Sequence, residues 1–307
     1  MEEIIRETEK ADAFLSVNQI LDEGEAYKRE PLYKKVYRKI RANKLAVFCC
    51  CYLILIIIAS SCAFLSPYDP DKVDLLHKLE DPNMQHFFGT DNLGRDYFTR
   101  ILYGGQISLV IGIAAMCISV VFGTLFGALS GFLGGKVDAF MMRIVDVLMS
   151  VPSFLFIIVI NAVLKPGLVT MIIVIALFSW MSVARIVRAE TMSLKKRDFI
   201  LAAKNLGENM WEIILRHIIP NMIPVVIVAA SNSIAKAILT ESSLSFLGFG
   251  VNPPIASWGS MLQGAQKQIM TQPSLAVFPG VFILLTVMSF HVIGDILRDT
   301  LDPKNSN

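Results

Sequence analysis

The sequence is poor in charge for its length. Asp, Glu, Lys and Arg make up 18% of its 307 residues, whereas an average soluble domain carries about 25%. The net charge at neutral pH is only +2, so no strongly basic surface favours nucleic acid binding. The loop G-x-x-x-x-G-K-[ST], which cradles nucleotide phosphates, does not occur in the sequence. We therefore expect no nucleic acid partner, and no ATP bound or hydrolysed by this chain.

Residues that commonly bind metals or carry catalysis are also few. The four histidines are His77, His86, His217 and His291, which fall on both sides of the membrane predicted below. Four of the five cysteines lie within residues 49–62. They show no metal-ligand or disulfide spacing and are expected to behave as small hydrophobic residues. No nucleophile and base share a compartment, so we predict no catalytic residue, no metal site and no cofactor bound by this chain.

Long apolar segments are the dominant feature of what is present. Hydrophobic residues make up 54% of the chain, and a bilayer-spanning helix needs about 20 mostly apolar residues. The candidate spans are 45–65, 105–133, 147–164, 168–184, 222–247 and 275–294. The third should continue a helix that begins near Asp138 and should be kinked at Pro152. The predicted fold is an all-α polytopic membrane protein with six transmembrane helices.

The distribution of Lys and Arg predicts the orientation. Cytoplasmic loops are enriched in these residues, and most of them fall on the side of the N-terminus when the six spans alternate. We therefore expect cytoplasmic termini: a segment 1–44 without a cleavable signal peptide, and a tail 299–307. Residues 66–104 form the longest extracytoplasmic loop. The basic cluster between Lys28 and Lys44 could contact anionic lipid, although simple anchoring of the first span explains it as well.

The segment 198–221 lies between two spans and is the most informative part of the sequence. Asp198 can accept hydrogen bonds from the free N–H groups at the start of a helix. Gly207 can adopt the left-handed conformation that closes a helix, and Pro220 ends the segment. The two short helices are expected at 199–206 and 210–219. A short helix with small residues, held just outside the membrane, is typical of a docking element for a soluble partner.

Glycines also form a regular stripe in the second span. Gly123, Gly127 and Gly131 make two successive G-x-x-x-G steps, which allow another helix to approach closely. Packing within the chain and contact with a partner subunit are both possible, and packing within the chain is the simpler explanation.

Segment 198–220 resembles the conserved cytoplasmic loop of ATP-binding-cassette importer permeases. The pattern of that family is E-A-A, three residues, Gly, nine residues, then I-x-L-P. The residues that match at the right spacing are Ala202, Ala203, Gly207 and Pro220. Leu201 stands where the family has glutamate, and His217 stands where it has isoleucine.

Further blocks narrow the resemblance to the dipeptide, oligopeptide and nickel branch of these permeases. They are residues 86–96 (HFFGTDNLGRD) with 103–109, residues 244–259, and residues 278–303. The similarity runs from about residue 45 to residue 303. The arrangement is similar to that of the C-type subunit of an oligopeptide importer.

The resemblance implies a non-catalytic permease subunit in the membrane of a prokaryotic cell. Its five-helix core would span residues 105–298 and include a cytoplasmic coupling loop at 193–221. The coupling residues would be Asp198, Leu201, Ala202, Ala203, Lys204, Gly207 and Pro220. The implied partners are a second homologous permease, two ATPase subunits that bind ATP and magnesium, an extracytoplasmic binding protein, the peptide cargo and membrane lipid.

Alternatives to this function follow from the same residues. Nickel or small glycosides are alternative cargoes, because selection in this branch resides largely in the binding protein. A secondary transporter or channel would also have six spans, but it would not need the docking segment. An intramembrane enzyme would need a catalytic dyad that the sequence does not contain.

Two ionisable residues, Lys236 and Glu241, fall within the fifth span. A charge at this depth is costly, so Lys236 should face protein or water rather than lipid. We hypothesise that Lys236 lines the translocation path, the alternative being a structural ion pair with a neighbouring helix or subunit. Glu241 is grouped with it as a candidate path residue, although its sequence block favours a role in the architecture.

The loop 66–104 contains Asp91 and Asp96 beside Gly89 and Gly94. An ion-binding loop would need acidic or amide ligands at alternate positions, and the residues between these aspartates break that pattern. We predict a rigid cap with glycine turns that helps to receive the binding protein.

Overall fold

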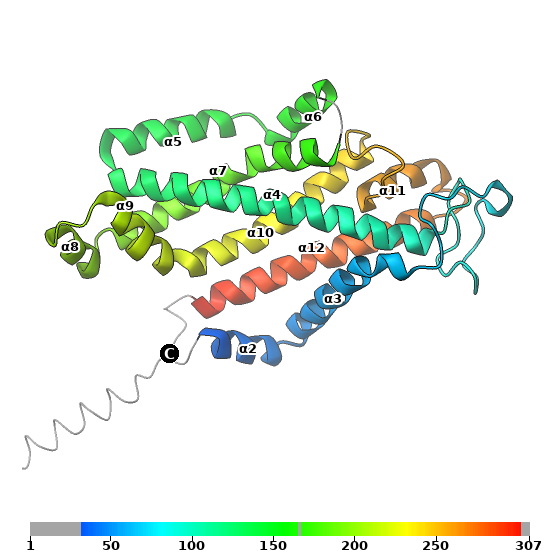
Figure 1. Cartoon of the computed structure of the whole chain (residues 1–307), viewed down its shortest axis with the longest axis horizontal. Helices are drawn as coiled ribbons and strands as arrows, with labels where there is room; N and C mark the ends of the chain where they lie inside the picture. The colour runs from blue at the N-terminus through cyan, green and yellow to red at the C-terminus, as the bar shows by residue number, and fades with distance from the viewer. Residues whose placement is uncertain (1–31, 165–166, 302–307) are drawn as a thin grey trace, which may run out of the picture.

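The computed structural model describes residues 32–164 and 167–301, and the regular elements in these residues are helices (Figure 1). In chain order they are α2 (Leu32–Ala42), α3 (Lys44–Ser61), the 3-10 turns η1 (Ala63–Leu65) and η2 (Leu75–His77), α4 (Tyr97–Leu133), α5 (Gly135–Met149), α6 (Ser153–Val163), α7 (Leu168–Leu194), α8 (Asp198–Asn205), α9 (Met210–Glu212), the π-helical turn η3 (Ile213–Ile218), α10 (Ile219–Phe246), α11 (Trp258–Ala265), the 3-10 turn η4 (Gln266–Gln268) and α12 (Ser274–Leu301). Parts of the predicted end segments, 1–31 and 302–307, lie outside the described residues, as do residues 165–166.

The long helices run side by side as a bundle. α4 packs lengthwise against α7 and α10, and α12 packs against α10 and α3. In the described residues, α3, α4, α7, the continuous stretch Met210–Phe246 and α12 are long and apolar enough to cross a membrane. α5 and α6 form a bent pair that adds a sixth crossing if it is counted as one span. The predicted all-α membrane fold is confirmed, and the orientation of the termini stays a prediction.

The spanning helices leave much of their apolar surface uncovered. Only 22% to 44% of the residues in their most apolar windows are buried within the chain. In water such surfaces would be unfavourable. They are therefore available to lipid and to other subunits.

The third span differs from the prediction of one helix that begins near Asp138, continues through 147–164 and is kinked at Pro152. The helix ends at Met149 and a new one starts at Ser153, with an angle of 72° between them. Pro152 occupies the N-cap position of α6 rather than the interior of a helix. Proline lacks a backbone N–H and disfavours a helical conformation in the residue before it. The chain therefore breaks at Pro152 instead of bending gently.

α5 is attached to the bundle through a charged contact that the sequence did not reveal. Arg188 on α7 donates from Nε and Nη2 to the two carboxylate oxygens of Asp138, at 2.5 and 2.6 Å. Ser130 on α4 donates to the same carboxylate at 2.5 Å. Bidentate pairs of this kind are among the stronger polar contacts in proteins. They hold the start of α5 beside α4 and α7.

Other helix boundaries also differ from the prediction: α3 ends at Ser61 rather than at 65, and α12 runs to Leu301 rather than to 294. α4 begins at Tyr97 rather than at 105, because the Asp96 carboxylate caps it and accepts a hydrogen bond from the Thr99 N–H at 2.7 Å. The loop before α4 therefore ends at Asp96 rather than at residue 104. α7 continues past the predicted end at 184 to Leu194, so this helix extends toward the docking segment.

The glycine stripe of α4 packs within the chain. A Cβ atom added to Gly123 would lie 2.7 Å from the Trp180 carbonyl oxygen on α7, and one added to Gly131 would lie 2.8 Å from that of Arg188. Gly127 faces the backbone of α7 in the same way. The intramolecular interpretation of the stripe is therefore confirmed.

Candidate docking helix and translocation path

α8 is the first of the two short helices predicted in the segment 198–221. Its N-cap residue is Arg197, so Asp198 is the first residue inside the helix. The capping role predicted for Asp198 is therefore wrong by one position. Its carboxylate remains in the first turn, where a negative charge interacts favourably with the helix dipole.

The end of α8 has the geometry predicted for Gly207. Gly207 has a φ of +82°. Its N–H donates to the Lys204 carbonyl at 3.1 Å, and the Glu208 N–H donates to the Ala203 carbonyl at 3.2 Å. These two bonds form a Schellman motif, which satisfies carbonyl groups at the end of the helix and reverses the chain. The prediction of a glycine turn is confirmed.

The two small residues of α8 have different surroundings. Ala203 is only 4% exposed and packs with Ile200 against Ile213 and Ile214 of the following turn. Ala202 is on the exposed side, and Leu201 is 46% exposed there. Leu201, at the family's glutamate position, therefore presents an apolar rather than a charged surface to a partner.

Lys204 is directed back toward the spanning helices. Its Nζ lies 4.9 Å from the centre of the Phe132 ring, at the end of α4, a favourable cation–π distance. Lys195, between α7 and α8, lies over the same ring and donates a hydrogen bond to the Phe132 carbonyl. Burial lowers the pKa of Lys195, and the neighbouring Lys204 lowers it further. These lysines fix α8 against the end of α4.

The second predicted helix does not end at Pro220. Asn209 caps α9 and forms a reciprocal capping box with Glu212. The helix then widens into the π turn η3 and continues as α10, with Pro220 in its first turn. Proline has no N–H to donate to the carbonyl four residues earlier. The π turn lies just before Pro220, where that hydrogen bond is missing. Residues 210–246 consequently form one continuous rod that joins the docking segment to the fifth span.

A side-chain hydrogen bond braces the glycine turn from the other side. His217 Nε2 lies 2.8 Å from Glu208 Oε2, so the loop after Gly207 is attached to the π turn. In the sequence, His217 stands out only as a departure from the family pattern. A pairing across a turn between residues nine positions apart could not be recognised from local spacing.

A cavity of about 700 Å³ lies between α7, α8, α10 and α12. Its charged and amide lining residues are Glu190, Arg197, Asn221, Asn232 and Arg298. Phe199 of α8 also lines it, so the docking helix and the cavity share a wall. A smaller cavity of about 90 Å³ shares Asn232 and reaches Lys236. Lys236 thus lies on the same side of α10 as Asn232, which lines both cavities.

Glu241 lies on a different face of α10 and does not line these cavities. Its side chain is fully buried and accepts hydrogen bonds from Ser245 at 2.7 Å and Ser108 at 3.0 Å. The Ser108 hydroxyl also accepts a hydrogen bond from the Trp258 N–H at 3.3 Å. The carboxylate therefore joins α10 to α4 and to the start of α11. The structure does not bring Lys236 and Glu241 together.

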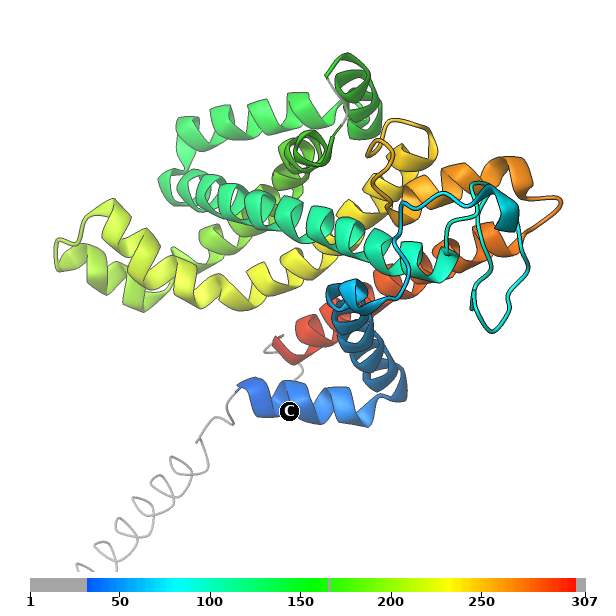
Figure 2. The ribbon, with the colours of Figure 1, turned by 45° about the vertical axis from the view of Figure 1, so that its right-hand side comes forward.

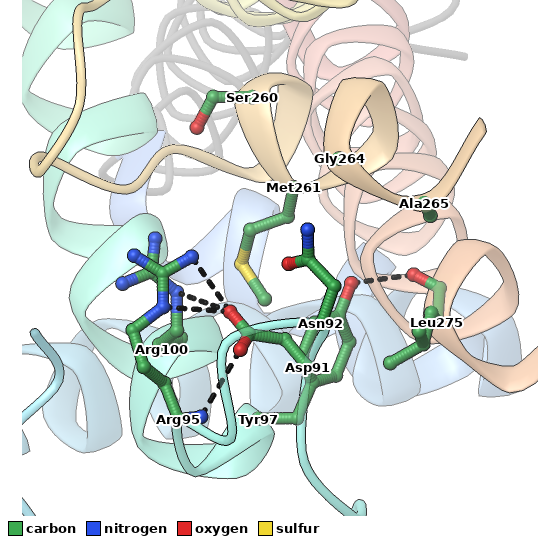
Figure 3. Close-up of a pocket in the computed structure, with 10 residues that line it drawn as sticks. All are labelled: Asp91, Asn92, Arg95, Tyr97, Arg100, Ser260, Met261, Gly264, Ala265 and Leu275. Atoms are coloured by element: carbon green, nitrogen blue, oxygen red, sulfur yellow. Dashed lines mark hydrogen bonds and ion pairs between the residues drawn. The ribbon is translucent and has the colours of Figure 1, made fainter. Parts of the chain in front are cut away.

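The opposite end of the bundle is covered by the loop before α4, which folds around Asp91 (Figure 3). The Asp91 carboxylate accepts hydrogen bonds from the backbone N–H of Leu93 at 2.8 Å and of Arg95 at 3.0 Å, and from Arg95 Nε at 2.7 Å. Arg100 Nε lies 3.7 Å from it. Among the residues that the structure describes, no group of three or more His, Cys, Asp and Glu side chains could hold a metal ion.

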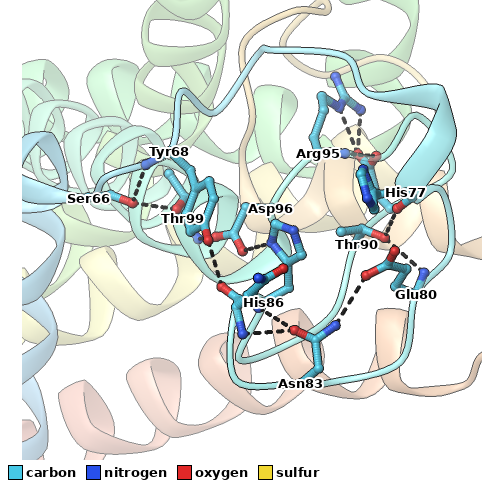
Figure 4. A network of polar contacts seen from close by, with 12 residues as sticks. Ser66, Tyr68, His77, Glu80, Asn83, His86, Thr90, Arg95, Asp96 and Thr99 are labelled. Atoms are coloured by element: carbon cyan, nitrogen blue, oxygen red, sulfur yellow. Dashed lines mark hydrogen bonds and ion pairs between the residues drawn. The ribbon is translucent and has the colours of Figure 1, made fainter.

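A second carboxylate, Asp96, ties this loop to the bundle (Figure 4). Its Oδ1 lies 2.8 Å from Nδ1 of His86. Gly89 has a φ of +74°, which agrees with the predicted glycine turn. The Phe88 ring stacks on Phe278 of α12 with 4.1 Å between ring centres. The loop is therefore held to α4 and α12 by its own polar and aromatic contacts.

Comparison with known proteins identifies the family. Residues 123–307 match the family described as "Binding-protein-dependent transport system inner membrane component". The chain belongs to this family. Residues 32–82 also match the N-terminal TM domain of oligopeptide transport permease C.

Individual relatives of this permease are similar over nearly their whole length. The oligopeptide permease OppC of Bacillus subtilis is 40% identical over 274 residues, covering 89% of this chain and 90% of the relative. OppC of Haemophilus influenzae is 41% identical over 94% of both chains. The dipeptide permease DppC of Bacillus subtilis is 38% identical, over 92% of this chain and 89% of the relative.

A solved structure shows the same fold. The inward-facing methionine ABC transporter MetNI matches with a TM-score of 0.54 and 16% identity, over 66% of this chain and 97% of that chain. The permease is thus a multi-pass inner-membrane component of a prokaryotic ABC transporter. It is a transport subunit rather than an enzyme.

Proposed function

We propose that this permease translocates peptides delivered by an extracytoplasmic binding protein. The support is that relatives named for oligopeptide and dipeptide transport are 38% to 41% identical to it over most of its length. A relative named for glutathione transport, from Pectobacterium atrosepticum, is 39% identical. Nickel and small glycosides remain the alternative cargoes.

Coupling to the energy source occurs through α8. The observation that carries this proposal is the uncovered outward side of the helix, where Leu201 is 46% exposed and Leu206 is 82% exposed, with the small Ala202 beside them. Isolated apolar side chains at a surface are ordinary, but Leu201 on the helix and Leu206 at its C-cap both lie on a short element outside the spanning rods. This side of α8 fits a groove in an ATPase subunit.

The inward side of α8 transmits the movement. Ile200 and Ala203 pack on the π turn, which continues without a break into α10. A displacement of α8 therefore moves the rod that carries Lys236 along the candidate path. Nucleotide shifts the populations of two states because it has a different affinity for each.

The remaining partners belong to the same proposal. A second homologous permease completes the path beside the cavity that reaches Lys236, and two ATPase subunits bind ATP and magnesium. This chain binds no cofactor. The binding protein sits on the loop 66–96. This loop lies at the end of the bundle away from α8 (Figure 1).

Substitution of Ala202 by Trp tests the docking surface. The added ring would project from the exposed side of α8 and keep the ATPase from seating closely. The matched control is Ala162→Trp, because Ala162 is an exposed alanine on α6 at the other end of the bundle. Assembly with the ATPases and peptide uptake are measured in proteoliposomes that contain the complete complex.

The expected result is loss of bound ATPase and at least a tenfold loss of uptake for Ala202→Trp, with both retained by Ala162→Trp. Normal ATPase binding and uptake by Ala202→Trp would contradict α8 docking. Uptake of nickel or a glycoside, and not of peptides, by the unmodified complex with normal ATPase binding would contradict only the cargo.

A further inference from the structure

The basic helix α2 has a fixed place at the edge of the bundle. Only Asn43 separates it from the spanning helix α3. The Asn43 side chain caps α3, accepting hydrogen bonds from Leu45 N–H at 3.0 Å and Ala46 N–H at 3.4 Å. Because α3 starts directly after this cap, α2 must lie at the boundary of the membrane. In Figure 2 it crosses below α3 rather than continuing it.

One side of α2 is already occupied by the permease itself. Lys39 donates from Nζ to the Asp299 carbonyl of α12 at 2.5 Å, and Val36 and Ile40 are partly buried. α2 also contacts α3. These contacts attach the helix to the bundle in a fixed orientation. The orientation determines which way its remaining sides face.

The uncovered sides of α2 combine aromatic and basic residues. Tyr33 is 69% exposed and Tyr37 is 66% exposed, and their spacing of four residues places them on one face. Lys34 and Arg41 are exposed, and their spacing of seven residues also places them on one face. At 3.6 residues per turn the basic face adjoins the tyrosine face. No acidic residue occurs in α2.

This combination matches the chemistry of a phospholipid headgroup layer. Tyrosine is enriched where membrane meets water, because its ring is apolar and its hydroxyl is polar. Lys and Arg bind phosphate, and amphipathic helices with such faces lie in the plane of the interface. We propose that the exposed side of α2 docks onto anionic phospholipid headgroups, with Lys34 and Arg41 at lipid phosphates and Tyr33 and Tyr37 at headgroup depth.

Lipid recognition and simple charge anchoring make different demands on α2. Anchoring needs only net positive charge on one side of α3, whereas recognition needs lipid phosphates in contact with the exposed residues. Each basic residue near an anionic surface is expected to increase the equilibrium constant for lipid contact roughly fivefold. Removal of both Lys34 and Arg41 should therefore reduce contact with anionic lipid by about 25-fold at most.

The experiment uses the complete transporter in nanodiscs with photoactivatable phosphatidylglycerol or phosphatidylcholine. After irradiation and chymotryptic digestion, mass spectrometry measures the fraction of peptides from residues 33–41 that carry lipid. The test variant is Lys34→Gln with Arg41→Gln. The matched control is Lys72→Gln with Lys78→Gln, which removes two exposed charges from the loop at the other end of the bundle.

The expected result is preferential labelling of this segment by phosphatidylglycerol. The labelling should fall at least fivefold in the test variant and stay unchanged in the control. Equal labelling by the two lipids, or labelling that the test variant does not reduce, would overturn the proposal. Absence of lipid labelling, with the segment protected by another subunit, would overturn it in favour of a protein contact.

Discussion

Gly207 offers a graded test of the glycine turn, because the cost of replacing it can be separated into backbone and steric parts. Its φ of +82° lies in the left-handed region, which costs a residue with a Cβ atom about 1–2 kcal/mol. No heavy atom lies within 4 Å of a Cβ built at this position, so steric overlap adds nothing. The expected shift is about fivefold to thirtyfold in the equilibrium that forms the turn.

The side chains should therefore rank by their tolerance of a positive φ. Asn adopts this conformation with the smallest penalty, Ala with more, and the β-branched Val with the largest. Hydrolysis of ATP stimulated by the binding protein, measured on the reconstituted complex, should fall in the order Gly, Asn, Ala, Val. Gly207→Ala should thus weaken coupling about fivefold or more.

A matched control separates turn geometry from added bulk. A Cβ atom added to Gly264, on α11, would also meet open space, and this glycine has no positive φ. Gly264→Val should therefore leave stimulated hydrolysis unchanged. The amount of assembled complex is measured in parallel for each variant. Full activity of Gly207→Val, or an Asn variant as impaired as the Val variant, would show that the left-handed turn is not what couples α8 to α10.

Two further predictions concern the spanning helices. Gly123→Ala should lower the free energy of unfolding of the permease by about 1–3 kcal/mol, because the new Cβ would meet α7 backbone at 2.7 Å. Gly280→Ala, in open space on α12, should not lower it. Equal melting temperatures of the two variants in detergent would contradict the close packing. Lys236→Met should alter the KM or the maximal rate of peptide uptake without changing the amount of complex, while Lys267→Met, an exposed lysine of η4, should alter neither. Unchanged uptake of every peptide by Lys236→Met would exclude a path role for this lysine.

The docking helix shows how far local sequence signals extend. The position of α8 and its closure at Gly207 were predictable, because both depend on residues within a few positions of one another. The surroundings of the two alanines were not predictable. Ala203 is buried because the chain reverses after α8 and packs Ile213 and Ile214 against it. That contact is a tertiary feature. Ala202 is consequently the better residue for testing a partner contact.

The continuity of the second short helix with the fifth span was also not predictable from the sequence. Pro220 is a strong local signal for the end of a helix, and the prediction followed it. The π turn over Ile213–Ile218 carries the chain past the position where proline removes a hydrogen bond. No periodicity in the sequence marks such a turn, because it differs from an α-helix only in which carbonyl each N–H reaches.

The sequence by itself determined that this chain crosses a membrane repeatedly, where most spans lie, and which segment turns at a glycine. Length, hydropathy and backbone preference are properties of neighbouring residues, so they can be obtained without knowing the fold. Only the tertiary structure decided that Lys236 lines a small cavity beside Asn232 while Glu241 is buried among serines. The reason is that the face of a helix that becomes covered depends on which helices pack against it. The break at Pro152 was local in origin, but its 72° angle is a relation between two helices that only the folded chain fixes.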